Sequence, residues 1–415
     1  MSGPLRPLIR AVTIGVCVAG LAGCRSGGGG NAIRDRLAAC PETFGEVVRA
    51  PETFRVQVAV AKVERTADGR PVLQRMTWRC GDEYFYPAST VKLLAAVAAL
   101  EMLSELRAAT GNPLVNADAP LRIQPLFDGD AIQEREPSNR GGGFITVQHE
   151  IRRIMLVSNN PAFNRLYDLV GVDELNERMH RAGLQSVRIS HRLSDARPVP
   201  DQSRTAAVTI RTALGDTEVP AREGRTPVPL EQPGVLVGEG MMRGGGVVEQ
   251  GPVDFSRRNA VSLLDLQDAL IMILRPDIDL GGRRFALDEN DRVRLASPME
   301  QYPRESPNPL LVGSQYTDDY CKLFLPGLRE WRPDRRLRVV NKVGQAYGFT
   351  IDNAYIEDPE TGDAFFLAAC IYTNADGVLN DDRYEYASVA EPFMAALALE
   401  MAKMLFPDGG GQPLR

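Results

Sequence analysis

Residues 86–106 read YPASTVKLLAAVAALEMLSEL. After Pro87 the stretch is rich in Ala and Leu, and apolar residues occupy nearly every side of a helix built from it. A helix that is apolar all round has to be enclosed by other elements. We therefore expect a central, buried helix over 87–106. Ser89 and Lys92 stand at its start, and their spacing of three residues puts both side chains on one helical face, one turn apart.

Strand patterns occur at both ends of the chain. FRVQVAVAKV (54–63) alternates and is β-branched, and Asp68-Gly69 predicts a turn into a returning strand over 71–78. Near the C-terminus three successive strands are predicted over 338–343, 349–356 and 364–373. One sheet is therefore expected to draw strands from both ends of the chain.

Helical patterns account for much of the remaining chain. They cover 31–50, 147–157, 161–170, 172–182, 259–274 and 384–405. The fold class predicted from this order is α/β, more closely α+β. It consists of an antiparallel sheet flanked by helices and an all-helical lobe, with Ser89 in the cleft between them.

These patterns predict a single domain over 33–406, followed by a short tail over 407–415. Two segments rich in polar residues, Gly and Pro read as insertions into the helical lobe, and the longer one is a candidate functional loop because of its length. The expected parts are a sheet lobe over 33–86 and 338–406, and a helical lobe over 87–337 with insertions at 107–145 and 190–258.

The composition excludes several classes of function. Among 415 residues, 48 are basic and 54 acidic, which gives a net charge of -6 and no basic excess for nucleic-acid binding. The three histidines, His149, His180 and His191, are far apart and have no metal-ligand spacing with Cys or acids. We expect no metal, no cofactor and no nucleic-acid partner. The oligomeric state is not indicated.

The N-terminus has the pattern of an export signal. Arg6 and Arg10 precede an apolar run that is too short to span a bilayer, and the run ends in Leu21-Ala22-Gly23-Cys24. This ending resembles the lipobox of bacterial lipoproteins, whose cysteine becomes the lipidated first residue. Residues 1–24 are then a signal peptide and 25–32 a flexible tether. We expect a membrane-anchored lipoprotein of the cell envelope, facing the periplasm or the exterior.

Four cysteines remain once Cys17 leaves with the signal and Cys24 carries the lipid. They are Cys40, Cys80, Cys321 and Cys370. In an oxidising compartment an even number permits two disulfides in three possible connectivities, and four buried free thiols are the alternative.

Three short motifs carry the chemistry. Ser89-Thr90-Val91-Lys92 opens the buried helix, where a buried lysine tends toward its neutral form and can accept the serine proton. Ser158-Asn159-Asn160 lies between two predicted helices, with Pro161 opening the second. Lys342-Val343-Gly344 lies in a predicted strand. Each motif alone occurs often by chance. Together they are informative, because they appear in this order and at a helix start, between two helices and in a strand.

Together the motifs resemble those of the superfamily of serine β-lactamases (class A-like) and penicillin-binding proteins. The resemblance extends over most of the chain, from about residue 45 to 405. It is carried by YPASTVK (86–92), MLVSNNPAFNRLYDL (155–169) and NKVGQAYGFTIDNAYI (341–356).

The resemblance implies a role for each site residue. Ser89 is the nucleophile, with Lys92 as its base, and Ser158 relays a proton to the leaving nitrogen. Lys342 holds Ser158 and the substrate carboxylate electrostatically. The substrate-binding residues are Asn160, which would hydrogen-bond the substrate amide, and Gly344 and Gln345. The backbone N–H groups of Ser89 and Gln345 would form the oxyanion hole.

The chain departs from the family pattern at two positions. Val343 stands where the family usually has a threonine whose hydroxyl helps to bind the substrate carboxylate. Class A enzymes also use a loop glutamate to activate the deacylating water, but the corresponding region here reads RLSDAR (192–197). Asp195, or an acid of the insertion such as Glu239 or Glu249, is a candidate substitute.

Three functions are compatible with the sequence. The first is a class A β-lactamase-like hydrolase of cyclic amides, with a part in β-lactam catabolism and the antibiotic response. The second is a D-Ala-D-Ala peptidase or penicillin-binding protein that releases β-lactams slowly. The third is a lipid-anchored binding module that keeps the fold without turnover. A pulse-chase experiment with a fluorescent penicillin separates these functions. A β-lactamase should lose the label quickly, a penicillin-binding protein should keep it, and a binding module should not be labelled at all.

Replacing Cys24 tests the lipid anchor. Cys24→Ala is expected to block lipid attachment, so that the chain loses its detergent-extractable membrane association. Fractionation of cells expressing each form, with mass spectrometry of the N-terminal peptide, measures this. Unchanged processing and membrane association in the variant would contradict the prediction.

Overall fold

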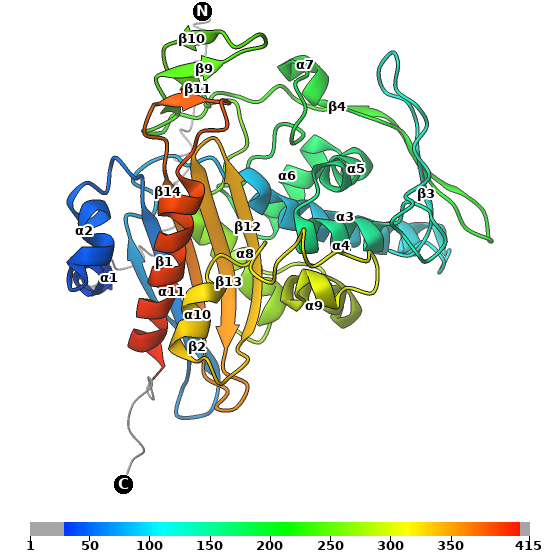
Figure 1. The fold of residues 1–415 in the computed structure, drawn as a ribbon. Coiled ribbons are helices and arrows are strands. Elements are labelled where there is room, and N and C mark those ends of the chain that lie inside the picture. The colour runs from blue at the N-terminus through cyan, green and yellow to red at the C-terminus, as the bar shows by residue number, and fades with distance from the viewer. Residues whose placement is uncertain (1–28, 407–415) are drawn as a thin grey trace, which may run out of the picture.

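The computed structural model describes residues 29–406, and its centre is one five-stranded antiparallel sheet (Figure 1). The strand order is β12-β13-β14-β1-β2. The bounds are β1 Gln57–Arg65, β2 Pro71–Trp78, β12 Arg338–Ala346, β13 Phe349–Glu357 and β14 Ala364–Tyr372. Since β14 pairs with β1, the two ends of the chain meet in the middle of the sheet, as predicted.

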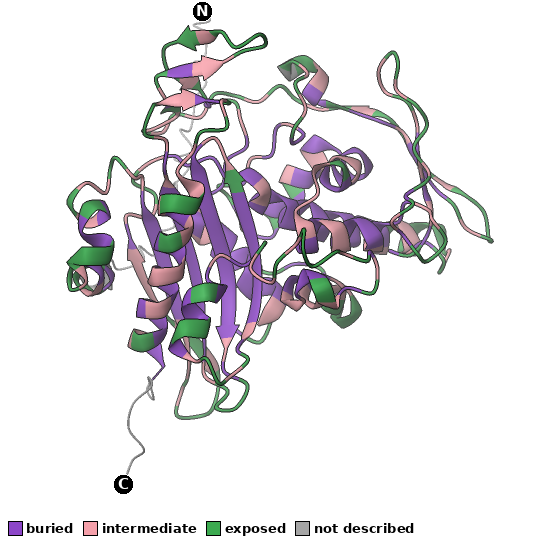
Figure 2. Ribbon diagram, viewed as in Figure 1, coloured by how far each residue is buried: buried purple, intermediate pink, exposed green. Residues whose placement is uncertain are grey.

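Both faces of the sheet are covered, which explains why its strands read as nearly continuous apolar runs. Along β1, Val58 and Val60 enter one core and Ala59 and Ala61 the other. This alternation follows from the two-residue period of a strand. Figure 2 shows the central strands almost wholly buried. The fold class predicted from the sequence is confirmed.

The helical lobe surrounds α3 (Val91–Thr110), which is the predicted central helix. Helices α4 (Val147–Val157), α5 (Asn160–Val170), α6 (Val172–Arg181) and α9 (Glu289–Glu300) pack against it. Residues 91–103 of α3 are all buried. Another helix, α8 (Leu263–Leu274), packs on the sheet against β1, β13 and β14.

Three expectations about the helices need correction. The pattern over 31–50 forms two helices, α1 (Gly29–Ala38) and α2 (Pro41–Arg49), because Pro41 cannot continue the first helix and opens the second. The predicted tether over 25–32 therefore overlaps α1. The closing helix over 384–405 begins with a π-helical turn at Tyr386–Ala390, and α11 spans Glu391–Leu405.

Helix α10 (Leu325–Trp331) lies outside the helical lobe, although the sequence placed all of 87–337 there. It packs beside α11 on the sheet, and Figure 1 shows the two in front of the strands. Leu325 and Leu328 join the core that also holds Phe365 and Leu367 of β14. A short amphipathic helix can cover any apolar face, so its sequence pattern does not indicate which one.

The two insertions have more structure than their composition predicted. The segment 107–145 contributes β3 (Leu121–Ile123), which pairs with β5 (Val208–Ile210). The segment 190–258 contains the short helix α7 and several two- or three-residue strands. These elements are α7 Val199–Gln202, β4 Arg204–Thr205, β5 Val208–Ile210, β6 Thr217–Val219, β7 Arg222–Glu223, β8 Leu236–Val237, β9 Gly240–Met242, β10 Val248–Gln250 and β11 Val253–Asp254.

Residues 1–28 and 407–415 lie outside the described part, so the signal peptide, Cys24 and the tail are not placed. Within residues 29–406, no helix has the length and the apolar character needed to cross a membrane. In the same range Cys40, Cys80, Cys321 and Cys370 are all free thiols. This favours free thiols over disulfides, but only Cys321 and Cys370 are buried, while Cys40 and Cys80 are half-buried.

Gly327 sets how closely α10 approaches α11. A Cβ atom at this position would lie 1.7 Å from the backbone oxygen of Ala395, and a backbone atom cannot move aside as the end of a side chain can. Gly327→Ala is expected to lower the free energy of unfolding by about 3 kcal/mol, as overpacking does in a dense core. Urea unfolding measures it. Gly313→Ala is the control, because nothing lies within 4 Å of its Cβ. Equal stability of the two variants would contradict the prediction.

Candidate active site

Ser89 lies in a strained turn rather than in the first turn of an α-helix. Residues Ala88–Thr90 form a 3₁₀ turn, and α3 starts at Val91. Ala88 has a φ of 48°, a left-handed conformation that costs energy for a residue with a Cβ. The hydroxyl of Thr90 donates to the Pro87 carbonyl at 2.6 Å and closes the turn. Ser89 is partly exposed while its neighbours are buried, so the turn presents the serine to the cleft.

The amine of Lys92 is buried beside the second motif. Its Nζ donates to the Asn160 Oδ1 at 2.6 Å, to the Ser158 Oγ at 3.2 Å and also to the Ser158 carbonyl. No carboxylate within residues 29–406 forms an ion pair with it. Burial, and then the charge of Lys342, lower the pKa of Lys92 well below its ordinary value. A lysine in this state is suited to accept a proton.

Ser158 stands between two lysines. It caps the end of α4 with a left-handed φ of 52°, and Asn159 then caps α5 by accepting from the Ala162 N–H at 2.9 Å. The Ser158 Oγ is 3.0 Å from the Lys342 Nζ and 3.2 Å from the Lys92 Nζ. The Ser-Asn-Asn motif therefore turns the chain so that one hydroxyl contacts both amines.

Asn160 links this centre to the loop at 190–197. Its Oδ1 accepts from Lys92, and its Nδ2 donates to the Ser194 Oγ at 2.6 Å. The Nδ2 group has a second hydrogen, so the role of binding a substrate amide is still open to it.

Lys342 is almost fully buried at the middle of β12. Its Nζ donates to the Ser158 Oγ and, at 2.7 Å, to the Val343 carbonyl. Burial lowers the pKa of Lys342 to about 8. The amine is therefore charged below about pH 8 and loses its charge above it.

A buried network beneath Lys342 was not predicted from the sequence. Lys322 Nζ donates to the Val339 carbonyl at 2.8 Å and to the Asn341 Oδ1 at 3.0 Å, and Asn341 Nδ2 donates to Asp352 Oδ1 at 2.8 Å. Burial raises the pKa of Asp352 to about 6 and lowers that of Lys322 to about 8. Asn341 was visible only as the residue before the third motif. Nothing in the sequence pairs it with residues 322 and 352.

Gly344 brings the third motif against the nucleophile. A Cβ atom here would lie 2.7 Å from the Pro87 carbonyl oxygen and 3.0 Å from the backbone nitrogen of Ser89. Only glycine permits this approach, since both obstacles are backbone atoms. Gln345 follows and lines the same cavities as Ser89. The arrangement suits an oxyanion hole made by the N–H groups of Ser89 and Gln345.

Two cavities meet at Ser89, and Asn160 and Gln345 also line both. The first, about 730 Å³, is bounded by Val343, Tyr320 and Glu391, and the second, about 680 Å³, by Tyr86 and Arg258. The site therefore has two arms that extend from the serine. Several lining residues could not be singled out from the sequence because they lie outside the three motif segments: Arg258, Asp319, Tyr320, Cys321, Asp382 and Glu391. Tyr347 also lines the second cavity and lies within the third segment, but nothing in the sequence gave it a role.

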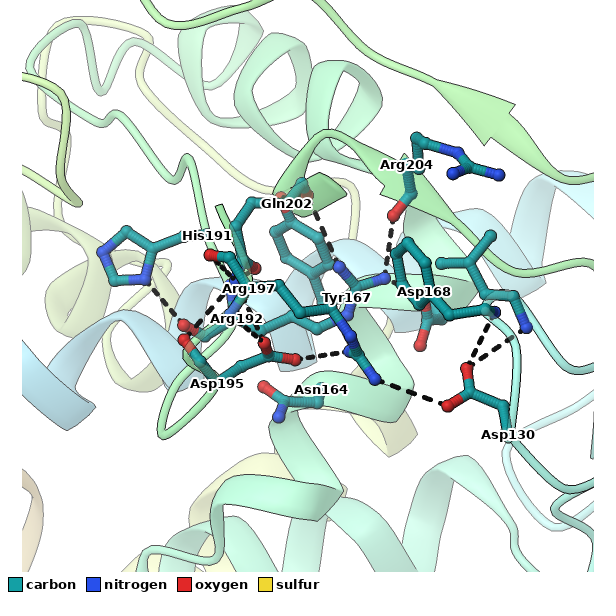
Figure 3. A network of polar contacts seen from close by, with 12 residues as sticks. Asp130, Asn164, Tyr167, Asp168, His191, Arg192, Asp195, Arg197, Gln202 and Arg204 are labelled. Carbon is teal, nitrogen blue, oxygen red and sulfur yellow. Dashed lines mark hydrogen bonds and ion pairs between the residues drawn. The ribbon is translucent and has the colours of Figure 1, made fainter. Parts of the chain in front are cut away.

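Of the three acids proposed as deacylating base, only Asp195 lines one of these two cavities. Its carboxylate accepts from the Arg197 Nη1 at 2.6 Å, from the Arg197 N–H at 2.9 Å and from Gln202 Nε2 at 3.2 Å. Figure 3 shows Asp195 and Arg197 turned toward each other, with Arg197 also reaching Asp130. Glu249 instead pairs with Arg243 at 2.7 Å on the surface.

A model of the β-lactamase enzyme family matches residues 79–216, about a third of the chain. The matched part includes the first two motifs. The resemblance to the superfamily of serine β-lactamases and penicillin-binding proteins is therefore confirmed. No curated protein sequence matches the chain.

The chain is similar to several solved structures, among them a protein called L2 and two β-lactamases. A structure of L2 complexed with relebactam is 20% identical, covers 89% of this chain and 99% of that one, and has a TM-score of 0.49. A β-lactamase from Burkholderia ambifaria is 16% identical, with 89% and 98% covered and a TM-score of 0.49. One from Xanthomonas campestris pv. campestris is 18% identical, with 89% and 97% covered and a TM-score of 0.48.

Adding a methyl group at Gly344 tests the packing between β12 and the nucleophile turn. Gly344→Ala is expected to push the strand and the turn apart. Labelling of Ser89 by a fluorophosphonate should then slow by at least about tenfold, because the N–H donors of the oxyanion hole would no longer point at the oxyanion. Intact-protein mass spectrometry measures the rate. Gly45→Ala is the control, because its Cβ would approach closer than ordinary contact only to the flexible end of Arg49, at 3.2 Å. Equal labelling rates would show that the close approach is unnecessary.

Proposed function

We propose that this chain is a serine acyl-hydrolase that opens β-lactam-type cyclic amides through an acyl-enzyme on Ser89. The observation that carries the proposal is the contact of two buried lysine amines, Lys92 and Lys342, with the hydroxyl of Ser158. The coarser assignment, a hydrolase of the serine β-lactamase type, is supported by the family match over residues 79–216.

The first step proposed is attack by the Ser89 hydroxyl on the amide carbon. Neutral Lys92 takes the hydroxyl proton, and the N–H groups of Ser89 and Gln345 stabilise the oxyanion. When the C–N bond breaks, the leaving nitrogen takes a proton from Ser158, which regains one from Lys92. The charge on Lys342 keeps Ser158 in place and attracts a carboxylate on the leaving side.

Deacylation is the weaker half of the proposed cycle. A base has to lie within about 3 Å of the water that it deprotonates. Asp195 is the best placed of the proposed acids, yet its oxygens are engaged by Arg197 and Gln202. Val343 also supplies no hydroxyl to the substrate carboxylate, which costs about 1 kcal/mol of binding. The engagement of Asp195 supports slow release of the acyl group, and Val343 supports weak activity on ordinary penicillins.

The engagement of Asp195 favours a second candidate, a D-Ala-D-Ala peptidase or penicillin-binding protein with a long-lived β-lactam adduct. Its substrate would be a cell-wall peptide. The envelope location proposed from the sequence, with a lipid on Cys24, would bring either activity to the compartment where such substrates occur.

Pre-steady-state kinetics with nitrocefin test the proposal. We expect a burst of about one equivalent per protein, followed by a slow phase, because acylation is well supported and deacylation is not. Ser89→Ala should give no burst and no covalent adduct. Ser314→Ala, at an exposed serine outside the site, is the control and should behave as the unmodified chain.

Two results would contradict this account. A linear progress curve at high turnover would mean that an efficient base exists. Absence of both burst and adduct in the unmodified chain would support a non-catalytic binding module instead.

A further inference from the structure

The second cavity at Ser89 continues into a third, which the long insertion encloses. The third cavity has a volume of about 610 Å³ and is bounded by residues of the loop at 190–202 and of the insertion at 241–258. The two cavities share six lining residues: His191, Ser194, Asp195, Arg258, Tyr347 and Asn380. One arm of the site therefore extends well beyond the space around the serine.

The far wall of this arm is fixed in place. Strand β9 of the insertion pairs in parallel with β15 (Val378–Leu379), and the Glu239 N–H donates to the Gly377 carbonyl at 2.7 Å. Asn380 Nδ2 also donates to the Met242 carbonyl at 3.2 Å. Figure 1 shows β9 and β10 beyond the end of the sheet. The wall is thus built from two distant parts of the chain, which hold each other through backbone hydrogen bonds.

The lining of the third cavity is positively charged. It includes four arginines and two aspartates, Asp195 and Asp254. Arg197 is neutralised by Asp195, and Arg243 by Glu249 at the rim. Burial lowers the pKa of His191 to about 4, so this ring adds no charge at neutral pH. The hydrogen bond from the Ser256 N–H, and also the charge of Arg257, lower the pKa of Asp254, so this carboxylate offsets Arg257. The excess charge is therefore that of Arg258.

Arg258 is the cation that lines both cavities. Within residues 29–406, no carboxylate forms an ion pair with it. Its guanidinium lies over the rings of Phe255, at 4.7 Å, and Tyr347, at 5.4 Å. Phe255 and Tyr347 themselves pack edge to face. Stacking on aromatic faces holds the group while its N–H edge stays available for a planar anion.

We propose that this arm selects substrates whose acyl side chain carries a carboxylate, and that Arg258 binds that carboxylate. The inference rests on the proposed function, because Ser89 defines which end of the substrate enters which arm. Val343 lines the first cavity, and so does Ser158, which Lys342 contacts, so the leaving portion belongs on this side. The acyl portion then enters the second and third cavities and directs its side chain toward Arg258. A guanidinium can hold a carboxylate through two parallel hydrogen bonds.

Two penicillins that differ by one carboxylate test this. Benzylpenicillin and its α-carboxylated analogue carbenicillin share the same ring system, and the second-order rate constant for labelling Ser89 is measured by intact-protein mass spectrometry. This rate does not depend on deacylation. The carboxylated compound is expected to react about tenfold faster, the ratio that one charge-assisted hydrogen bond provides.

The variants separate binding by Arg258 from a general effect of charge. Arg258→Ala should bring the ratio of the two rates close to one, and Arg258→Lys should keep part of the preference. Arg70→Ala, which removes a paired arginine in the exposed turn between β1 and β2, should keep the full ratio. Thermal melting shows whether each variant is folded.

The outcomes are distinguishable. Equal labelling by the two compounds in the unmodified chain, or a ratio unchanged in folded Arg258→Ala, would overturn this inference and leave the acyl-enzyme intact. Absence of any adduct on Ser89 with either compound would overturn the proposed function itself, and this inference with it.

Discussion

The site depends on two buried amines that share one hydroxyl. Lys92 and Lys342 both donate to the Ser158 Oγ, at 3.2 and 3.0 Å, and no carboxylate within residues 29–406 forms an ion pair with either. Two unpaired charges at this separation and depth are costly, so at least one amine has to give up its proton. Burial lowers the pKa of both amines, and the charge of Lys342 lowers that of Lys92 further.

The fold brings these two amines together from distant parts of the chain. Lys92 comes from α3, Ser158 from the turn between α4 and α5, and Lys342 from β12 at the other end of the chain. The sheet joins the chain ends, and Gly344 lets β12 touch the turn that carries Ser89. Beneath the strand, Lys322, Asn341 and Asp352 fix the backbone next to Lys342. The insertion then adds an arm to the site without altering this centre.

Much of the fold could be predicted from the sequence because its signals are local. The β-branched runs become β1 and β12 to β14, and the apolar stretch after Pro87 becomes α3. Residues that act through distant partners could not be predicted. Arg258 belongs to no motif, and the ion pair that engages Asp195 depends on how the loop folds back. Ala88 also gave no sign of its left-handed backbone, because alanine ordinarily avoids that conformation.

The protonation of Lys92 tests the account most directly. In a chain with ¹⁵N-labelled lysine, NMR titration of the Nζ signals, assigned with Lys92→Arg and Lys342→Met variants, reports each pKa. The account predicts that Lys92 titrates well below the ordinary lysine value of 10.5, and that its pKa rises in Lys342→Met because a neighbouring positive charge is removed. A Lys92 that titrates near 10.5, or that does not respond to Lys342→Met, would contradict it.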